Sequence, residues 1–370
     1  MEKPEKTTII LSGGGSGGPV TTLLAVSKEL IKDNSHLNLI FIGTKKGPER
    51  LLIDSFRVYD KHIKFIAISS GKLRRYFSVA NFLDFFKIFS GFIISFLILS
   101  KEKPNLVISA GGFVSVPLVW AAYLKKIPIL IHQQDVRPGL ANRLMAPFAR
   151  LITVSFEKSL SDYGPKAVWI GNPSNQLEQN DTFISGIKEK YNLQSGLPLI
   201  LVTGGGTGSQ AINNLIIKAL PKLISSAQII HLTGKGKLPI DQKNDAPNYQ
   251  AFEFLNNDEV FALMSISTLV ISRCGLASLT ELCALEKPAI LIPIPDSQQE
   301  DNAEVFKRYK AAVVLNQKTL SVEELIDKIK EVLVNNELRK NLTTNIFKIM
   351  KKNAAETMAS LIWEILAPKE

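Results

Sequence analysis

One pattern occurs twice in the chain and constrains its fold more than any other feature. An apolar run passes directly into a glycine-rich loop and then into a helix-like segment, at "TTIILSGGGSGGPVTTLLAVSKELIK" and again at "LPLILVTGGGTGSQAINNLIIKAL". Short, continuously apolar runs that alternate with helices are typical of strands buried on both faces of a parallel sheet. The repeat therefore predicts an α/β protein built from two similar halves.

The rest of the chain extends each half in the same way. The first half continues with "NLIFIGT", "NLVISAGG" and "IPILIHQQ", and the second with "AQIIHLTGKGK" and "TLVISRCG". A chain of 370 residues is long enough for two domains, and the Pro/Asn/Gln-rich segment "GNPSNQLEQND" has the composition of a linker. We expect Rossmann-like domains at residues 1–172 and 173–345. We also expect a final helix from about Leu338 to Leu366, with residues 346–370 packing back on the first domain.

Charge and cysteine content limit the partners. The net charge of +10 favours an acidic partner, which could be nucleic acid, a phosphorylated substrate or an anionic membrane. Zinc-finger spacing and RNP-type aromatic motifs are lacking, so we do not expect nucleic acid. Cys274 and Cys283 fit neither a disulfide framework nor a metal site, and we expect two buried thiols, no metal and no cofactor. The charged start is unlike a signal peptide, which predicts a cytoplasmic protein.

Glycine loops between a strand and a helix let a backbone approach a phosphate, although a tight turn explains them equally well. Neither loop is a Walker motif. The acidic residue that a dinucleotide fingerprint needs after the second strand is missing, because "FIGTKKG" supplies Thr44 and lysines. This argues against a dehydrogenase. Pro19 suits the first turn of a helix, but it can neither accept a proton nor donate a hydrogen bond.

Nine segments in series resemble a known family: "SGGGSGGPVTTLLAVSKEL", "IGTKKGPERLL", "SSGKLRRY", "SAGGFVSVP", "HQQDVRPGLANR", "GNP", "VTGGGTGSQAINN", "SRCGLASLTEL" and "PDSQQEDNA". They are similar to the MurG family of bacterial glycosyltransferases. The resemblance implies the GT-B fold, in which two Rossmann-like domains face each other across a cleft. It also implies inverting transfer of N-acetylglucosamine from UDP-GlcNAc to undecaprenyl-diphospho-muramoyl-peptide in peptidoglycan synthesis.

The resemblance places the UDP-GlcNAc donor on the second domain. It implies that Glu281 holds the ribose hydroxyls and that Phe254 and Leu255 lie beside uracil, while Gln298 and Gln299 bind the sugar. The helix amides that would face the diphosphate belong to Leu276, Ala277, Ser278, Leu279 and Thr280. From the residues alone, the default for Glu281 is a solvated helix residue, and the two glutamines could be part of a surface loop.

The polyprenyl-diphosphate acceptor would meet the first domain, at "SAGGF" and at the loop that contains Ser16, Gly17 and Gly18. Four positions depart from the family pattern. Pro19 replaces a usual histidine, and His132-Gln133-Gln134-Asp135 replaces a frequent His-Glu-Gln-Asn. Asn175 replaces an arginine, and Gly206 replaces a serine.

An inverting transfer needs a base for the acceptor hydroxyl, and the departures remove the side chains that could supply one. Asp135 is our candidate, as base or as a residue that positions the acceptor, although an aspartate there could simply cap a helix. Catalysis could otherwise rest on positioning and leaving-group stabilisation, or the protein could be a non-catalytic relative. A transferase with another lipid acceptor and a sugar-nucleotide epimerase are further alternatives.

The region "LRRYFSVANFLDFFKIFSGFIISFLILSKEKP" is the most apolar. Its longest uncharged run, from Ile88 to Ser100, is shorter than the ~20 residues of a membrane span. A buried helix is one interpretation. The other is a helix on an anionic membrane surface, and it rests on these phenylalanines and basic residues: Phe82, Phe85, Phe86, Phe89, Lys72, Arg74, Arg75, Lys101 and Lys103. We expect a peripheral protein at the cytoplasmic face of the cell membrane.

Overall fold

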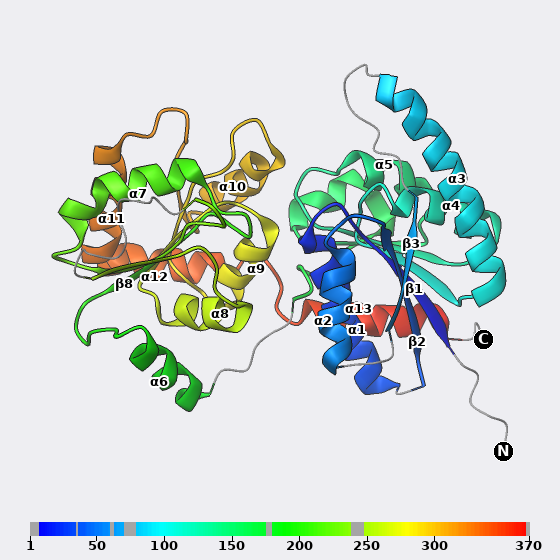
Figure 1. Ribbon diagram of the computed structural model, residues 1–370, viewed down its shortest axis with the longest axis horizontal. Coiled ribbons are helices and arrows are strands. Elements are labelled where there is room, and N and C mark those ends of the chain that lie inside the picture. Colours follow the sequence, from blue (N-terminus) through cyan, green and yellow to red (C-terminus); the bar gives the residue numbers. More distant parts are fainter. Residues whose placement is uncertain are drawn as a thin grey trace. The chain divides into compact units, whose positions relative to one another are not determined.

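The computed structural model describes residues 7–34, 36–59, 63–69, 79–174, 180–237 and 248–367, without the side chains of 58–59 and 79–86. The chain divides into two compact units (Figure 1). Unit 1 comprises Met1–Asn175 and Lys351–Glu370, and unit 2 comprises Gln176–Met350.

Unit 1 is built on a seven-stranded parallel sheet with the order β3-β2-β1-β4-β5-β6-β7. Its strands are β1 (Thr8–Ser12), β2 (Asn38–Thr44), β3 (Ile63–Ile68), β4 (Leu106–Ser109), β5 (Ile129–Gln133), β6 (Leu151–Val154) and β7 (Ala167–Trp169). The strand order reverses at β1, which pairs with β2 on one side and β4 on the other. Ligands of open parallel sheets bind at the carboxyl ends of strands at such a reversal, so the first glycine loop lies at the expected place.

Helices cover both faces of this sheet. The central strand β1 is therefore buried on both sides, which explains why it is apolar at every position except its ends. Ile9 and Leu11 pack with Met358 and Ile362, whereas Ile10 packs with Leu118 on the opposite face. The helices of unit 1 are α1 (Gly17–Asp33), α2 (Glu49–Tyr59), α3 (Val79–Glu102), α4 (Ser115–Leu124), α5 (Leu140–Met145) and α13 (Ala354–Leu366), with short 3-10 helices at Ala146–Phe148, Glu157–Asp162 and Gly164–Lys166.

Unit 2 repeats the plan with a six-stranded parallel sheet in the order β10-β9-β8-β11-β12-β13. Its strands are β8 (Leu199–Thr203), β9 (Gln228–Leu232), β10 (Tyr249–Phe252), β11 (Leu269–Ser272), β12 (Ala289–Leu291) and β13 (Val313–Val314). Its helices are α6 (Asp181–Lys190), α7 (Gln210–Leu223), α8 (Asn257–Ile266), α9 (Leu276–Ala284), α10 (Gln298–Arg308), α11 (Val322–Val334) and α12 (Asn336–Ile346). The second glycine loop follows β8, where the strand order again reverses. The predicted pair of parallel-sheet α/β domains is confirmed.

The predicted final helix from Leu338 to Leu366 is wrong in one respect, because it is two helices. α12 ends at Ile346 in unit 2, and α13 begins at Ala354 in unit 1. Asn353, which precedes α13, has a left-handed backbone with φ +59°. The continuous apolar periodicity hides this break, which falls at the crossing from one unit to the other.

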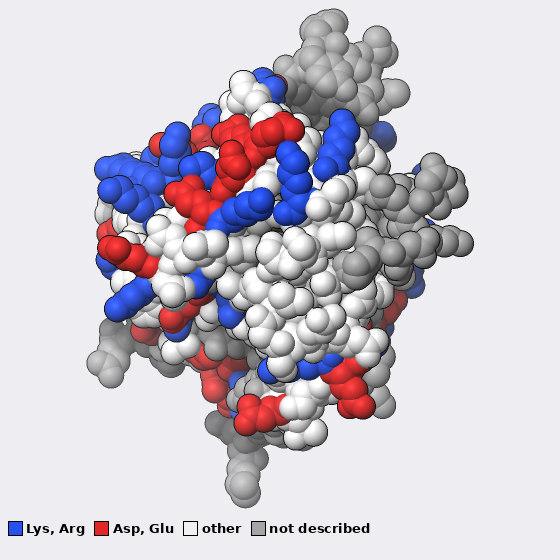
Figure 2. Space-filling model, turned by 90° about the vertical axis from the view of Figure 1, so that its left-hand side faces the viewer, with Lys and Arg blue, Asp and Glu red and all other residues white. Residues whose placement is uncertain are grey.

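The two units differ in charge. By sequence, unit 1 contains 26 Lys and Arg against 15 Asp and Glu, whereas unit 2 contains 18 against 19. The whole basic surplus of the chain therefore belongs to unit 1. The face shown in Figure 2 carries both signs side by side around a broad area without charged residues. Within the described residues, no helix combines the length and the apolar character that crossing a membrane requires.

Candidate active site

The first glycine loop leads from β1 into α1 through Gly13 to Ser16. Gly15 has φ +89°, a conformation that favours glycine. Ser16 precedes the helix with an extended backbone, and its side chain makes no capping hydrogen bond. The N–H groups of Ser16, Gly17 and Gly18 therefore lie at an uncapped helix start, where a partial positive charge favours an anion.

Two glycines of this loop are required by packing, not by a ligand. A Cβ at Gly13 would lie 2.9 Å from the Cβ of Pro19, and one at Gly14 would overlap the carboxylate of Glu49. At Gly17 and Gly18 a Cβ would find only ordinary contacts, at 3.6 and 3.7 Å. The close backbone approach that we inferred for a phosphate therefore serves the fold at the first two positions. Gly17 and Gly18 have no such structural role.

Pro19 is buried at the third residue of α1, where its side chain packs on Gly13. The first turn of a helix tolerates proline, because its missing N–H would have no partner within the helix. Pro19 therefore contributes shape and leaves the donors of the first turn to Ser16, Gly17 and Gly18.

Glu49, at the start of α2, was not among the predicted residues. It is fully buried, accepts the N–H of Gly15 at 3.0 Å and accepts the hydroxyl of Thr44 at 2.9 Å. In "GPERLL" it resembles a solvated helix residue. Its contact partners lie 34 and 5 residues away, so local pattern does not reveal it.

His132, at the end of β5, is fully buried and takes part in a polar network. Its Nδ1 lies 3.0 Å from Thr153 Oγ1, and its Nε2 lies 3.2 Å from both Asn172 Oδ1 and Ser155 Oγ. Burial lowers the pKa of His132 to about 4, so the imidazole is neutral near pH 7. It is a structural residue of the strand end.

Gln133 holds the loop that carries Asp135. Its amide nitrogen donates to the carbonyls of Asp135 at 2.6 Å and Arg137 at 3.4 Å. Its amide oxygen accepts from Asn142 Nδ2 at 2.6 Å and from the hydroxyl of Tyr163 at 2.9 Å. A glutamate, the usual family residue, could not donate to the two carbonyls when ionised.

The structure brings the "HQQD" segment beside the start of α1. Gln134 donates to Thr22 Oγ1 at 2.7 Å, and its side chain lies 3.7 Å from where a Cβ of Gly18 would be. Asp135 follows Gln134 and is partly exposed. Asn175 lies outside the described residues.

The second glycine loop follows β8 and shows the same division of roles. A Cβ at Gly208 would overlap the carbonyl oxygen of Thr233, and one at Gly204 would overlap the N–H of Ser209. Gly206 is exposed, and no described atom lies within 4 Å of a Cβ placed there. Packing therefore leaves Gly206 open to a ligand.

The N-terminus of α9 differs from those of the other helices in unit 2. Side chains cap α6, α7, α8, α10, α11 and α12, whereas Gly275 precedes α9 and supplies no side-chain cap. The amides of Leu276, Ala277 and Ser278 thus present an uncapped helix start. Leu279 and Thr280 have buried side chains, so a ligand could meet only their backbone.

Glu281 is in the second turn of α9 and is partly buried. Burial raises the pKa of its carboxyl to about 7. Because water solvates this carboxylate poorly, hydrogen bonds from hydroxyl groups stabilise it more than they stabilise a fully hydrated carboxylate. The alternative of a solvated helix residue does not fit this environment.

Arg273, which directly follows β11, is a second residue that sequence reasoning missed. Its guanidinium is buried and donates to the carbonyls of Ile292 at 2.9 Å and Pro293 at 3.1 Å, to Ser209 Oγ at 2.7 Å and to Gln317 Oε1. These acceptors are neutral. Arg273 therefore links the cap of α7 to the loop after β12 and adds a positive charge beneath the second glycine loop.

Gln299 connects two loops at the carboxyl ends of β11 and β12. Its Oε1 accepts the N–H of Cys274 at 3.2 Å and that of Ile294 at 3.1 Å. Its amide nitrogen lies 3.9 Å from a Cβ placed at Gly275, beside the α9 N-terminus. Gln298, its neighbour, is exposed.

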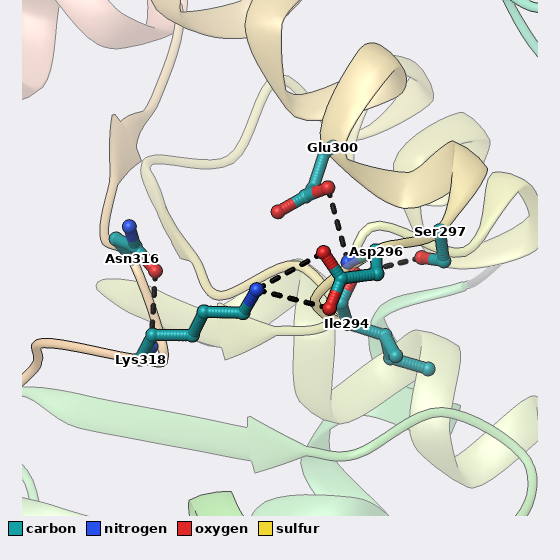
Figure 3. Close-up of polar contacts among 6 residues, drawn as sticks. All are labelled: Ile294, Asp296, Ser297, Glu300, Asn316 and Lys318. Carbon is teal, nitrogen blue, oxygen red and sulfur yellow. Dashed lines mark hydrogen bonds and ion pairs between the residues drawn. The ribbon is translucent and has the colours of Figure 1, made fainter.

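The turn before these glutamines is fixed by polar contacts (Figure 3). Asp296 has φ +57°, and its carboxylate receives Lys318 Nζ at 2.9 and 3.0 Å. Its N–H donates to Glu300 at 3.1 Å, and Ser297 donates to the carbonyl of Ile294 at 2.7 Å. The ion pair joins the loop after β12 to the segment after β13 and so places the start of α10.

The remaining predicted residues lie between β10 and α8, where Phe254 is 74% exposed and Leu255 is half-buried. Cys274 and Cys283 are buried free thiols. In the described part of the chain, His, Cys, Asp and Glu side chains form no group of three or more that could hold a metal ion.

Comparison with known proteins agrees with this geometry. The glycosyltransferase family 28 N-terminal domain matches residues 9–154, and the C-terminal domain of the same family matches residues 199–359. A protein of Clostridium kluyveri is 39% identical over 329 residues, which are 88% of this chain and 90% of that protein. A protein of Clostridium botulinum is 37% identical over 359 residues, 96% and 98% of the two chains. Both are named UDP-N-acetylglucosamine–N-acetylmuramyl-(pentapeptide) pyrophosphoryl-undecaprenol N-acetylglucosamine transferase.

Solved structures support the fold. Acinetobacter baumannii MurG superimposes with a TM-score of 0.76 at 24% identity, covering 97% of this chain and 99% of that one. The S. aureus MnaA–UDP complex gives 0.70 at 12% identity, covering 98% of each chain. The GT-B fold class and the resemblance to the MurG family are confirmed. The chain belongs to glycosyltransferase family 28.

Proposed function

We propose that the protein transfers N-acetylglucosamine from UDP-GlcNAc to an undecaprenyl-diphosphate-linked muramoyl-peptide. The observation that carries this proposal is the near full-length identity of 37–39% to transferases named for that reaction. The uncapped α9 N-terminus with Glu281 on the same helix supports it, because a sugar nucleotide offers both a diphosphate and ribose hydroxyls.

The donor half of the reaction follows from unit 2. The amides of Leu276 to Ser278 and the dipole of α9 stabilise the diphosphate. The buried guanidinium of Arg273 adds a positive charge beneath the second glycine loop. When the bond between the anomeric carbon and the phosphate oxygen breaks, UDP leaves with the electron pair. Donors already directed at that diphosphate stabilise the leaving group more than the bound substrate. Gly206 and the amide nitrogen of Gln299 lie at the same edge of the sheet.

The acceptor half belongs to unit 1. The amides of Ser16, Gly17 and Gly18 offer an anion site for the lipid-linked diphosphate. The acceptor hydroxyl must lose its proton as its oxygen attacks the anomeric carbon on the face opposite UDP. The loops after β1, β4 and β5 carry one carboxylate, Asp135. His132 is buried and weakly basic, and Gln133 and Pro19 cannot accept a proton. We therefore assign the base to Asp135.

Peripheral membrane binding is also part of the proposal. On α3, exposed apolar side chains include Phe89 at 58% and Leu97 at 62%. The end of α4 lies beside this surface, because Lys125, which follows α4, places its Nζ 4.2 Å from the ring centre of Phe96 on α3. The neighbouring Leu124 is 62% exposed and adds to the apolar area. The charge surplus of unit 1 suits an anionic leaflet. The side chains of Phe82, Phe85 and Phe86, and residues Lys72, Arg74 and Arg75, lie outside the described residues.

The overall proposal predicts UDP release that requires both UDP-GlcNAc and the lipid-linked muramoyl-peptide. The measurement is coupled UDP detection with purified acceptor, alongside UDP-GalNAc and a diacylglycerol acceptor as matched alternatives. Turnover with the diacylglycerol alone would assign another lipid acceptor. Donor binding without any turnover would identify a non-catalytic relative.

For Asp135, we expect Asp135→Asn to lower kcat by about 10²–10⁴-fold, the usual contribution of a general base. The KM for UDP-GlcNAc should stay unchanged, because the donor residues lie in unit 2. Asp162→Asn, at a surface carboxylate of the same unit, is the control. Unchanged kcat in Asp135→Asn would exclude the aspartate as base.

The raised pKa of Glu281 predicts pH-dependent donor affinity. Its carboxyl is ionised above about pH 7 and protonated below it, and only the ionised form accepts both ribose hydroxyls. The Kd for UDP-GlcNAc should therefore rise as pH falls, approaching about tenfold per pH unit below 7. UDP-GlcNAc is the suitable probe, because both of its phosphates are esterified and do not titrate here. Calorimetry from pH 5.5 to 8.5 checks this, and Glu281→Gln should bind more weakly with a flat profile.

Membrane binding predicts that Leu97→Glu lowers partitioning onto anionic vesicles by about tenfold or more, since a buried leucine contributes roughly 1.5–3 kcal/mol. Leu51→Glu is the matched control, because Leu51 on α2 of the same unit is 74% exposed. Co-sedimentation at low salt measures both. Equal binding of the two variants would show that α3 does not contact the membrane.

A further inference from the structure

We propose that Glu49 is a positioning residue for the acceptor: its buried carboxylate fixes the first glycine loop and decides which amides of that loop face the ligand. The proposal rests on the proposed function only in naming the ligand as the lipid-linked acceptor. The geometry of the loop stands independently of it.

The carboxylate connects the loops that follow β1 and β2. Its Oε1 accepts the N–H of Gly15 at 3.0 Å, and its Oε2 accepts the hydroxyl of Thr44 at 2.9 Å. Thr44 Oγ1 accepts the N–H of Gly47 at 2.9 Å, which leaves the hydroxyl proton free to be donated to Glu49. Glu49 also begins α2, where the helix dipole favours a negative charge. A single buried group thus ties two loops at the carboxyl edge of the sheet.

Three glycines from two segments, the loop after β1 and the end of β2 with its following loop, leave the space that this side chain needs. A Cβ at Gly14 or at Gly47 would overlap the carboxylate, and one at Gly43 would lie 3.1 Å from the Cβ of Glu49. A buried carboxylate is costly unless it is well hydrogen-bonded, so a loose fit would not retain it. Gly14, Gly43 and Gly47 therefore leave room for a carboxylate that belongs to the protein itself.

This arrangement determines the donors that remain for a ligand. The N–H of Gly15 is directed to Glu49 and is no longer available, and Pro19 has none to offer. The uncapped start of α1 then presents Ser16, Gly17 and Gly18. Without the bond to Glu49, Gly15 at φ +89° would lose its restraint, and the amides that follow it would lose their common direction.

Three variants and a control separate positioning from a general structural role. Glu49→Gln keeps an oxygen for Gly15 and an amide donor for Thr44, Glu49→Ala removes both bonds, and Thr44→Val removes one. Glu29→Gln, which alters an ion pair with Lys32 on the surface of α1, is the control. The readouts are KM for the lipid-linked acceptor, KM for UDP-GlcNAc, and hydrogen exchange of the Gly15 amide.

We expect Glu49→Ala to raise the acceptor KM by about tenfold or more, as for loss of a hydrogen bond to a charged group. Thr44→Val should raise it less, and Glu49→Gln should remain within about threefold of the wild type. The KM for UDP-GlcNAc should not change. Exchange at Gly15 should be slow in the wild type and in Glu49→Gln, and fast in Glu49→Ala.

Equal rises in both KM values, or a Glu49→Gln variant as impaired as Glu49→Ala, would overturn the proposal. An unchanged acceptor KM in Glu49→Ala would do so as well. If Glu49→Ala does not fold, an unchanged acceptor KM in Thr44→Val would overturn the proposal. A wild-type protein without turnover would refute the proposed function alone, because Gly15 exchange and vesicle-bound acceptor affinity still test Glu49.

Discussion

The close approach of two backbones at each strand-order reversal is the constraint on which the site depends. A Cβ at Gly112, which has φ +93°, would lie 2.6 Å from the carbonyl oxygen of Gly14. In unit 2, Gly208 and Gly234 meet in the same manner, each with a positive φ. Larger residues would separate the loops and move the starts of α1 and α7. Glycine is therefore required at these positions by the packing of the loops, and the same packing positions the starts of α1 and α7.

The two loops rest on opposite charges. Beneath the first lies the buried carboxylate of Glu49, and beneath the second lies the buried guanidinium of Arg273. Buried charges need hydrogen bonds from their surroundings, and both residues have them from loop backbone or side chains. Two loops that look alike in sequence thus differ electrostatically. The second is the better suited to a diphosphate leaving group, whose negative charge increases as it leaves, and this agrees with a donor site in unit 2.

Much of the architecture could be predicted from the sequence, because burial on both faces makes each central strand a continuous apolar run. The same reasoning failed at the α12–α13 break, where apolar periodicity continues across Asn353 although the chain changes unit. It also failed for Glu49 and Arg273, whose importance comes from partners such as Gly15 and Ser209 that are distant in sequence. The local sequence pattern therefore predicts secondary structure, whereas the role of a charged residue depends on contacts that form only in the folded protein.

The departures from the family pattern in unit 1 can be understood together. Gln133 donates to the carbonyls of Asp135 and Arg137, a geometry that an ionised glutamate would repel, so the amide and the loop conformation belong together. That loop carries an aspartate where the family often has asparagine. Pro19 meanwhile removes a titratable side chain from the start of α1 without disturbing its first turn. At these three positions two ionisable side chains are replaced by one, that of Asp135. It directly follows Gln134, which donates to Thr22 on α1.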